Sequence, residues 1–328
     1  MKIANCRVQI AKLKPFSNLE FQILNLKSLH NNFLGIPSEF SDLDKSEFVI
    51  LPVPYEQTTT YQVGTKHGPQ AIIHASQEVE TFDEELNLET FKAGICTLNP
   101  VEISTAGPER TLEKIYQTIK ELLDREKKVI MLGGEHTISI GAVKAFKEKH
   151  PDLSVLQMDA HADLRDSYQE NKFSHACVMR RIGEFSHFVS LGIRNMSIEE
   201  HEFIHNNKID PTDPKLDVFL AQDMRNSDRW RKEVIDKLGS DVYLTFDLDV
   251  FDPSIMPSVG TPEPGGLLWY ETLDFLKELV YKRNLVGFDV VELCPIPGLV
   301  APDFLAAKLI YKIIGHMVSK ERKTGAEI

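Results

Sequence analysis

Short apolar runs recur along the chain and alternate with amphipathic segments. Each run is four to seven residues long and is bounded by glycine, proline or polar residues, as buried strands are. We predict strands at residues 48–53, 129–132, 153–158, 188–191, 218–221, 242–246 and 285–291. Pro52 and Pro54 lack a backbone N–H, so the first strand is expected to end there or to lie at a sheet edge.

The segments between these runs have helical spacing. In residues 112–126, Ile115, Ile119, Leu122 and Leu123 fall on one stripe. We predict helices at residues 70–80, 112–126, 139–149, 177–182, 197–206, 227–238, 268–282 and 302–319. Strands that alternate with helices, without turn-linked strand pairs, indicate βαβ units and a mainly parallel sheet. The pattern therefore predicts one α/β domain, built as a three-layer α/β/α sandwich.

Two stretches carry weaker patterns. Residues 1–45 are expected to form an N-terminal arm or cap, with residues 46–328 as the main domain, and residues 23–29 fit either a short helix or a strand. The acidic stretch 78–89 is expected to be a solvated face or loop. The arm is also a candidate to touch the site of a neighbouring subunit.

The composition of the 328 residues is that of a globular protein, 42% hydrophobic and 26% charged. The net charge of −12 argues against nonspecific nucleic-acid binding and suits a small cationic partner. Cys6, Cys96, Cys177 and Cys294 have no metal-site or redox-motif spacing, so we expect reduced thiols in a cytoplasmic protein. No run reaches the roughly 18 apolar residues of a membrane span, and the first residues lack the apolar core of a signal peptide.

Candidate chemistry is concentrated in the sequence Asp159-Ala160-His161-Ala162-Asp163, directly after a predicted strand. Alternate residues of extended backbone point to the same side, so the two carboxylates and the imidazole could converge on one point. The alanines between them keep that point uncrowded.

Two further stretches have the same form. His136 follows one predicted strand, and Asp247 and Asp249 follow another. An Asp-x-Asp pair alone is more often a loop cap, and a lone histidine is more often structural. Three such stretches at the carboxyl ends of parallel strands favour one shared site. Gly133 and Gly134 are expected to be tight-turn residues that bring His136 close to backbone, since the Lys and Ser/Thr of a phosphate loop are missing.

Oxygen and imidazole ligands without thiolate favour Mn²⁺-like ions over structural zinc. The six candidate ligands are His136, Asp159, His161, Asp163, Asp247 and Asp249. This number exceeds the needs of one catalytic ion but suits two ions that share carboxylates. Four aspartates balance the charge of two divalent ions, and such ions make bound water a nucleophile at neutral pH.

The chain resembles the ureohydrolase (arginase/agmatinase) superfamily over residues 46–318. The matching motifs are GGEH (133–136), DAHAD (159–163), SH (174–175), DLDVFDP (247–253), SVGTPEPGG (258–266) and GFDVVELCP (287–295). The resemblance implies an α/β/α sandwich around an eight-stranded, mostly parallel sheet, assembled as homotrimers or homohexamers. It implies that two Mn²⁺ ions, held by the six residues above, support hydrolysis of a guanidinium group to urea. Ni²⁺ or another divalent ion stays open.

The resemblance also implies two catalytic residues. His175 matches the proton-shuttle histidine, with a surface-loop histidine as the alternative. Glu292 matches the carboxylate that grips the guanidinium, with a structural ion-pair partner as the alternative.

The resemblance further implies that the substrate is a small cationic guanidino compound. The segments 52–69 and 166–175 look like those of agmatinases, which act on agmatine and yield putrescine. Ala176 and residues 293–298 depart from the usual pattern near the substrate tail. Arginase, guanidinobutyrase, guanidinopropionase, guanidine hydrolase and formiminoglutamase activities are alternatives, and a non-catalytic binding protein is a more distant one. No nucleic-acid or membrane partner is expected.

Overall fold

A sheet of eight parallel strands forms the centre of the molecule. The computed structural model describes residues 31–207, 216–225 and 227–324, so Cys6 and the segment 23–29 lie outside it. The strand order is β4-β1-β5-β10-β9-β6-β7-β8, and every neighbouring pair is parallel. The strands are β1 (Phe48–Val53), β4 (Ile95–Thr97), β5 (Lys128–Gly133), β6 (Ser154–Met158), β7 (His187–Ile193), β8 (Leu216–Leu220), β9 (Asp241–Asp247) and β10 (Asn284–Val291).

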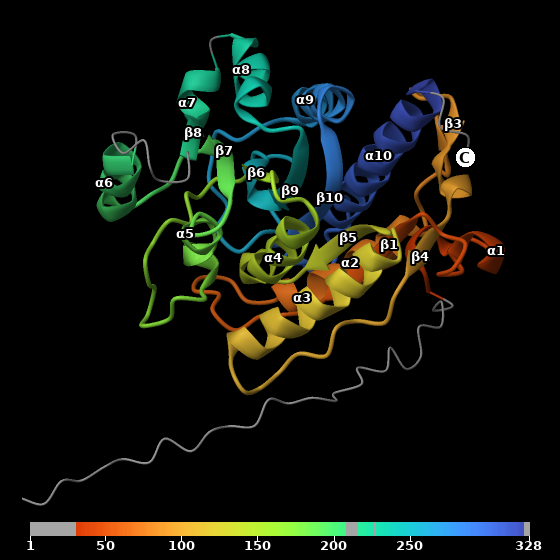
Figure 1. Cartoon of the computed structure of the whole chain (residues 1–328), viewed down its shortest axis with the longest axis horizontal. Helices are drawn as coiled ribbons and strands as arrows, with labels where there is room; N and C mark the ends of the chain where they lie inside the picture. The colour runs from red at the N-terminus through yellow and green to blue at the C-terminus, as the bar shows by residue number, and fades with distance from the viewer. Residues whose placement is uncertain (1–30, 208–215, 226, 325–328) are drawn as a thin grey trace, which may run out of the picture.

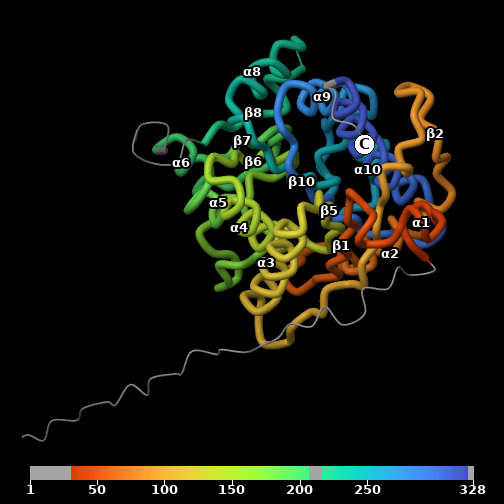
Figure 2. The backbone as a smooth tube through the Cα atoms, turned by 45° about the vertical axis from the view of Figure 1, so that its right-hand side comes forward, coloured from red at the N-terminus to blue at the C-terminus, as the bar shows by residue number. Residues whose placement is uncertain are grey.

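Helices cover both faces of the sheet and complete the predicted three layers (Figure 1). On one face lie α2 (Gly68–Ser76), α8 (Arg229–Lys237), α9 (Trp269–Lys282) and α10 (Ala301–Thr324). On the other lie α3 (Pro108–Asp124), α4 (Ser139–Lys149), α5 (Val178–Ile182) and α6 (Ile198–Asn207). Both views place β5 between α3 and α10 (Figure 1 and Figure 2). Two shorter helices are α1 (Ser38–Ser41) and α7 (Ala221–Met224).

The strands are buried on both faces, which is why they read as continuous apolar runs in the sequence. In β1, Phe48 and Ile50 join the core beside α2 and α10, whereas Val49 and Leu51 join the core beside α3 and α4. This alternation follows from the period of two in extended backbone. In the described part of the chain, no helix is long and apolar enough to cross a membrane.

The strand β1 continues through Pro52 rather than ending there. Pro52 stands in register with Leu132 of β5, but the ladder with β4 runs only from Phe48 to Ile50. The carbonyl of Pro52 still accepts a hydrogen bond from the N–H of Val101 (2.9 Å). The missing N–H of proline therefore lies where the pairing on that side is ending.

The acidic stretch 78–89 is not simply a solvated loop. It contains the antiparallel pair β2 (Phe82–Asp83) and β3 (Leu88–Glu89), a turn-linked pair that the sequence did not indicate. Asp83 is fully buried against Lys312 of α10. The short strand β4 was also not predicted, because its three residues are too few to form a recognisable run.

The described residues before β1 pack against the body of the protein. Phe33, Leu34 and Ile36 are buried in the core that contains α2 and α10. The N–H of Phe33 donates to Thr97 Oγ1 (2.9 Å) and that of Leu34 to Ser76 Oγ (2.8 Å). The three described cysteines are buried and unpaired.

Candidate metal centre and active site

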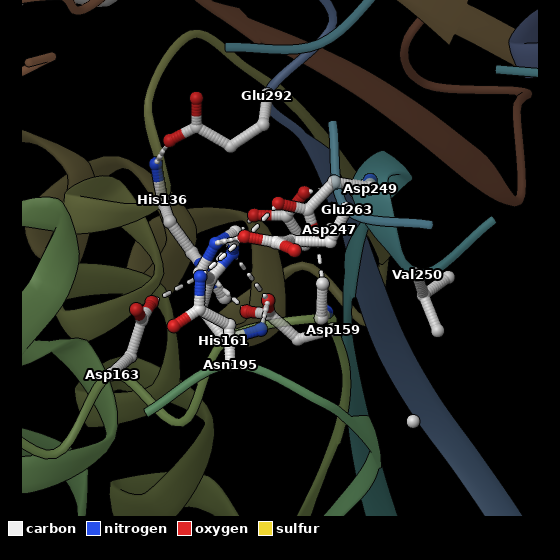
Figure 3. Close-up of polar contacts among 12 residues, drawn as sticks. His136, Asp159, His161, Asp163, Asn195, Asp247, Asp249, Val250, Glu263 and Glu292 are labelled. Carbon is white, nitrogen blue, oxygen red and sulfur yellow. Dashed lines mark hydrogen bonds and ion pairs between the residues drawn. The ribbon is translucent and has the colours of Figure 1, made fainter. Parts of the chain in front are cut away.

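The candidate site lies at the carboxyl ends of β5, β10, β9 and β6, four adjacent strands in the middle of the sheet. His136 follows β5, Glu292 follows β10, Asp247 ends β9 and Asp159 follows β6. A polar group at a strand end is aimed out of the sheet edge rather than into either apolar core. The parallel arrangement thus brings together residues from all the predicted stretches, as Figure 3 shows.

The six predicted ligands gather into two adjoining groups. His136, Asp159 and Asp247 form one group, and Asp159, His161 and Asp249 form the other, each with its ligand atoms within 4.8 Å of one another. Asp159 belongs to both groups. Asp163 adjoins the first, with its Oδ2 3.1 Å from His136 Nδ1. The arrangement has the form expected for two cations that share a carboxylate.

Each of three aspartates uses one carboxylate oxygen to fix its own position. Asp159 Oδ1 accepts the N–H of His161 (2.6 Å), Asp247 Oδ1 that of Asp249 (2.9 Å), and Asp249 Oδ1 that of Ala160 (3.0 Å). The Oδ2 atoms of Asp159 and Asp247 face His136 Nδ1 at 3.2 and 3.5 Å. The Oδ2 of Asp249 faces His161 Nδ1 at 2.8 Å. The site is therefore held in shape by its own backbone.

A buried chain of hydrogen bonds sets the orientation of the His136 ring. Thr245 Oγ1 donates to Asp289 Oδ1 (2.7 Å), so it can only accept from His136 Nε2–H (2.8 Å). In the neutral ring Nδ1 is then a lone pair, and it has no hydrogen-bond donor although it is fully buried. A lone pair facing three carboxylates is unfavourable unless a positive charge lies between them. That charge is either a proton on Nδ1, since burial is outweighed by Asp159 and Asp163, which raise the pKa of His136, or a metal ion. The residues thus fit a divalent cation, and neither Thr245 nor Asp289 was picked out from the sequence.

The pKa values of Asp163, Asp247 and His161 show the same shortage of positive charge. For Asp159, by contrast, burial is outweighed by His136 and His161, which lower its pKa. Burial and the charge of Asp159 raise the pKa of Asp163 to about 7. Burial, with the charges of Asp249 and Asp159, raises the pKa of Asp247 well above its usual range. For His161, burial is outweighed by Asp249 and Asp159, which raise its pKa to about 12. Divalent cations would balance this negative charge in place of protons.

Glu292 turns back toward the site from the end of β10. Its Oε1 accepts the N–H of His136 (2.6 Å), and its other oxygen lies beside Gly260 on the pocket wall. Burial and the charge of Glu135 raise its pKa well above the usual range. No Lys or Arg in the described part of the chain pairs with Glu292. The alternative role as a structural ion-pair partner therefore has no support here.

The backbone is under constraint at two of these residues. Asp163 and Glu292 have φ values of 54° and 66°, in the left-handed region that non-glycine residues rarely adopt. Gly134 is needed for a different reason than a tight turn, because a Cβ there would lie 1.9 Å from the carbonyl oxygen of Tyr55. The absence of a side chain lets the end of β1 approach the loop that carries His136.

His175 lies on the wall of the same pocket but is not among the ligand groups. Its Nδ1 is 3.1 Å from Thr58 Oγ1, and Thr58 Oγ1 donates to Glu135 Oε1 (2.7 Å). Burial lowers the pKa of His175, with the charge of Glu135 acting in the opposite direction. Thr58 was not a predicted site residue, because only the fold brings it to His175.

The site opens to a pocket of about 170 Å³. Uncharged polar residues form much of its wall above the ligands, among them Thr59, Thr60, Gln62, Ser197 and Thr261. The pocket also contains Arg165 and Glu200, whose charged groups face each other at 3.9 Å.

Comparisons of the sequence and of the structure with known proteins both point to one family. The arginase family model matches residues 46–315. A relative from Synechocystis sp., named N(1)-aminopropylagmatine ureohydrolase, is 36% identical over 307 residues, which cover 89% of this chain and 98% of that protein. A Pyrococcus horikoshii agmatinase is 32% identical over 280 residues, covering 84% of this chain and 93% of that enzyme.

A solved structure extends the comparison to three dimensions. The agmatine ureohydrolase of Thermoplasma volcanium superposes with a TM-score of 0.77 at 31% identity, covering 87% of this chain and 94% of that one. The central sheet described above is the sheet of that fold. The chain belongs to the arginase family.

Proposed function

We propose that the protein is a ureohydrolase of the agmatinase type, which hydrolyses the guanidinium group of a small guanidino amine to urea. Agmatine is the first candidate substrate. The observation that carries the proposal is the convergence of six metal-type ligands with Glu292 and His175 on one pocket. Overall, the guanidinium and one water give urea and the protonated amine, which balances atoms and charge.

The reaction needs a strong nucleophile, because a guanidinium is resonance-stabilised and permanently cationic at neutral pH. Two divalent ions held by the six ligands would supply hydroxide at neutral pH and polarise the reacting carbon. We propose Mn²⁺ for both positions, because the ligands are oxygen and imidazole without thiolate.

Glu292 orients the substrate. Its Oε1 is fixed by the N–H of His136, so its second oxygen is the one that can accept a guanidinium N–H. Burial holds this carboxyl at a raised pKa, and an incoming cation favours its ionised form. A guanidinium therefore gains a hydrogen bond in which donor and acceptor carry opposite charges, which a neutral amide cannot form.

His175 gives a proton to the departing amine. The amine leaves as the C–N bond breaks, and it is a poor leaving group unless it gains a proton. His175 lines the pocket, where burial lowers the pKa of its imidazole, so a proton that the ring has taken up is readily passed on to the amine.

The substrate tail is the second part of the proposal. In the described pocket, Arg165 is the only Lys or Arg, and its charge faces Glu200 at 3.9 Å. A substrate with a carboxylate at its tail therefore finds no unopposed cation, whereas an amine tail meets neutral hydroxyl and amide groups. The relatives named for N(1)-aminopropylagmatine support that longer amine as a second candidate. Family membership is the basis for proposing a cytoplasmic homotrimer or homohexamer.

The test is urea release by the full-length chain loaded with Mn²⁺ or Ni²⁺. The substrates are agmatine, N(1)-aminopropylagmatine, arginine, 4-guanidinobutyrate, 3-guanidinopropionate and guanidine, with formamide release measured from formiminoglutamate. We expect kcat/KM for an amine-tailed substrate to exceed that for arginine by roughly 10²-fold or more, because the carboxylate of arginine would be desolvated without a partner. A preference for arginine or 4-guanidinobutyrate would contradict the argument about the tail. If no substrate gave urea or formamide with either metal, the proposed function itself would be contradicted.

A further inference from the structure

The hydroxyl of Thr58 makes three contacts, and together they define the direction of its proton. It lies 2.7 Å from Glu135 Oε1 and 3.1 Å from His175 Nδ1, and it accepts the backbone N–H of His175 at 3.0 Å. A hydroxyl has one proton to donate and two lone pairs with which to accept. If the Thr58 hydroxyl donates its hydrogen bond to Glu135, both of its lone pairs are available to accept from His175.

Glu135 is arranged as an acceptor of hydrogen bonds. It is fully buried, and its Oε2 accepts the N–H groups of Gln57 and Thr58, both at 2.7 Å. Its Oε1 is 2.6 Å from the hydroxyl of Thr137, in addition to that of Thr58. The two oxygens of Glu135 are thus surrounded by four donors, two backbone N–H groups and two hydroxyls, all at 2.6–2.7 Å. The Thr58 hydroxyl therefore donates its hydrogen bond to Glu135 rather than to His175.

We infer that Thr58 and Glu135 form a relay that fixes the tautomer of His175, with the proton on Nδ1. The inference rests on the proposed function, in which His175 is the proton donor. Because Nδ1–H donates to Thr58, Nε2 is the ring nitrogen left for the substrate in the pocket. Nε2 gains and loses its proton while every bond of the relay stays in place, so no hydroxyl has to reorient during turnover. Thr58 and Glu135 are thus positioning residues, which act on the reaction through His175.

One other hydroxyl lies near the same nitrogen. Ser174 Oγ is 3.4 Å from His175 Nδ1, a longer contact than that of Thr58 and one without a carboxylate behind it. The Tyr168 ring packs edge-on against the imidazole with a centroid distance of 5.9 Å, so the ring is also held sterically. These contacts allow Ser174→Ala to serve as the matched control for loss of a hydroxyl beside Nδ1.

The direct test is the tautomer of His175 by ¹⁵N NMR. The full-length chain is labelled at histidine and loaded with Mg²⁺, because Mn²⁺ would broaden the signals, and the signals missing in His175→Ala identify the residue. We expect a protonated Nδ1 and an unprotonated Nε2 in the neutral ring. Thr58→Ser and Ser174→Ala should keep this pattern. A proton on Nε2 in the unmodified protein, or a tautomer change in Ser174→Ala, would overturn the inference.

Glu135→Gln gives the sharpest result, because it should reverse the tautomer. The side-chain amide must present its oxygen to the N–H groups of Gln57 and Thr58, which leaves its NH₂ facing the Thr58 hydroxyl. Thr58 then accepts from that amide and donates to His175 Nδ1, which moves the ring proton to Nε2. Thr58→Val removes the hydroxyl and should also release the Nδ1 proton. If both variants keep the Nδ1–H tautomer, the relay is wrong.

Kinetics distinguish the relay from a merely structural role. We expect Thr58→Val and Glu135→Gln to lower kcat about 10- to 100-fold, as loss of a supporting hydrogen bond to a site residue does. KM should stay within about threefold, because neither residue lines the pocket, and Thr58→Ser should restore kcat. In a His175→Ala background, Thr58→Val should have little further effect, and a full additional loss would contradict the relay. Lack of urea from the unmodified protein would instead count against the proposed function, and the NMR result would still decide the tautomer.

Discussion

Two regions of this protein bury carboxylates, and the groups that surround the carboxylates differ between the two regions. Beneath α10, the fully buried Asp83 Oδ1 accepts from Lys312 Nζ (2.9 Å) and from the N–H groups of Glu85 and Leu86 (3.0 Å each). Burial raises its pKa, but these donors outweigh burial and hold the pKa below the usual range. At the strand ends, Asp163 and Asp247 face other carboxylates, and their pKa values are raised.

The difference shows how to tell a buried group that stabilises the fold from one that serves a site. A carboxylate buried for stability is held by a cation and donors of its own chain, as Asp83 Oδ1 is, although Asp83 Oδ2 is buried without a partner among the described residues. A carboxylate kept for binding is left short of positive charge, which the ligand then supplies. The backbone agrees, because Asp83 lies in regular strand whereas Asp163 and Glu292 adopt left-handed φ values.

The largest effect should follow from changes at the strand-end cluster. We expect Asp159→Ala and Asp249→Ala to lose bound metal and to lower kcat/KM by roughly 10⁴-fold or more, because the nucleophile is no longer generated at neutral pH. Metal content by mass spectrometry and urea release measure the two effects.

The matched control for these variants is Asp241→Asn. Asp241 lies at the opposite end of β9, where it contacts His150 Nδ1 (2.8 Å) and the Asn284 side chain. This variant should keep both metal and activity. Full activity or full metal content in Asp159→Ala would show that the cluster is not a metal site.

Changes at Lys312, which contacts the buried Asp83, should lower the stability of the fold rather than the activity. Lys312→Met leaves Asp83 buried without a cation and should cost about 3–5 kcal/mol of unfolding free energy. Denaturant unfolding of the metal-loaded protein measures this loss. Lys308→Met is the control, since Lys308 lies on the same helix but reaches only Glu84 at 4.0 Å. Equal losses in the two variants would remove the distinction between the regions.

The strand-end site could be predicted from the sequence, whereas the contact between Asp83 and Lys312 could not, for a physical reason. The ligands of the site follow apolar runs within a few residues, so a local pattern carries them, and the helix predicted at 139–149 has the observed bounds of α4. Asp83 and Lys312 are 229 residues apart, and Thr58 and His175 are 117 apart. Only the folded chain brings such pairs together, so residues 78–89 were expected to be a solvated face or loop, and Thr58 was not a predicted site residue.

His316 gives a pH-dependent test within the Lys312 region. It lies four residues after Lys312 and is buried with Nδ1 unpartnered, and burial lowers its pKa to about 4. The charges of Asp83 and Glu85 oppose this shift, those of Lys277 and Lys312 reinforce it, and the Tyr281 ring packs edge-on against the imidazole. The neutral ring is therefore the form that the folded state accepts.

The sign of the pH effect follows from that depressed pKa. Between about pH 6.5 and 4 the unfolded chain binds a proton that the folded chain does not, so stability falls as pH drops through this window. The contribution lost is about 3 kcal/mol, fully present above pH 6.5 and lost below about pH 4. Unfolding free energies at pH 7, 5.5 and 4.5 should therefore fall more steeply for the unmodified protein than for His316→Leu. Parallel curves would show that His316 is not held neutral.

The smallest effect should come from a carboxylate that lies in the site region but accepts hydrogen bonds from its own chain, as Asp83 Oδ1 does. Glu200 lines the pocket, yet its carboxylate accepts from Leu164 N–H (2.9 Å) and from the N–H and hydroxyl of Ser197 (2.7 and 2.8 Å). Ser197 Oγ in turn accepts the N–H of Glu200 (3.3 Å), which completes a capping box at the start of α6. Ser197→Ala should therefore cost about 1 kcal/mol of unfolding free energy, with Ser197→Thr as the control that keeps the hydroxyl. The kcat of the metal-loaded enzyme at saturating substrate should stay within about twofold, because the Ser197 bonds hold a helix and a substrate tail rather than a reacting atom. If kcat fell tenfold while stability held, nearness to the pocket would matter more than hydrogen-bond satisfaction, and the distinction drawn between the two regions would fail.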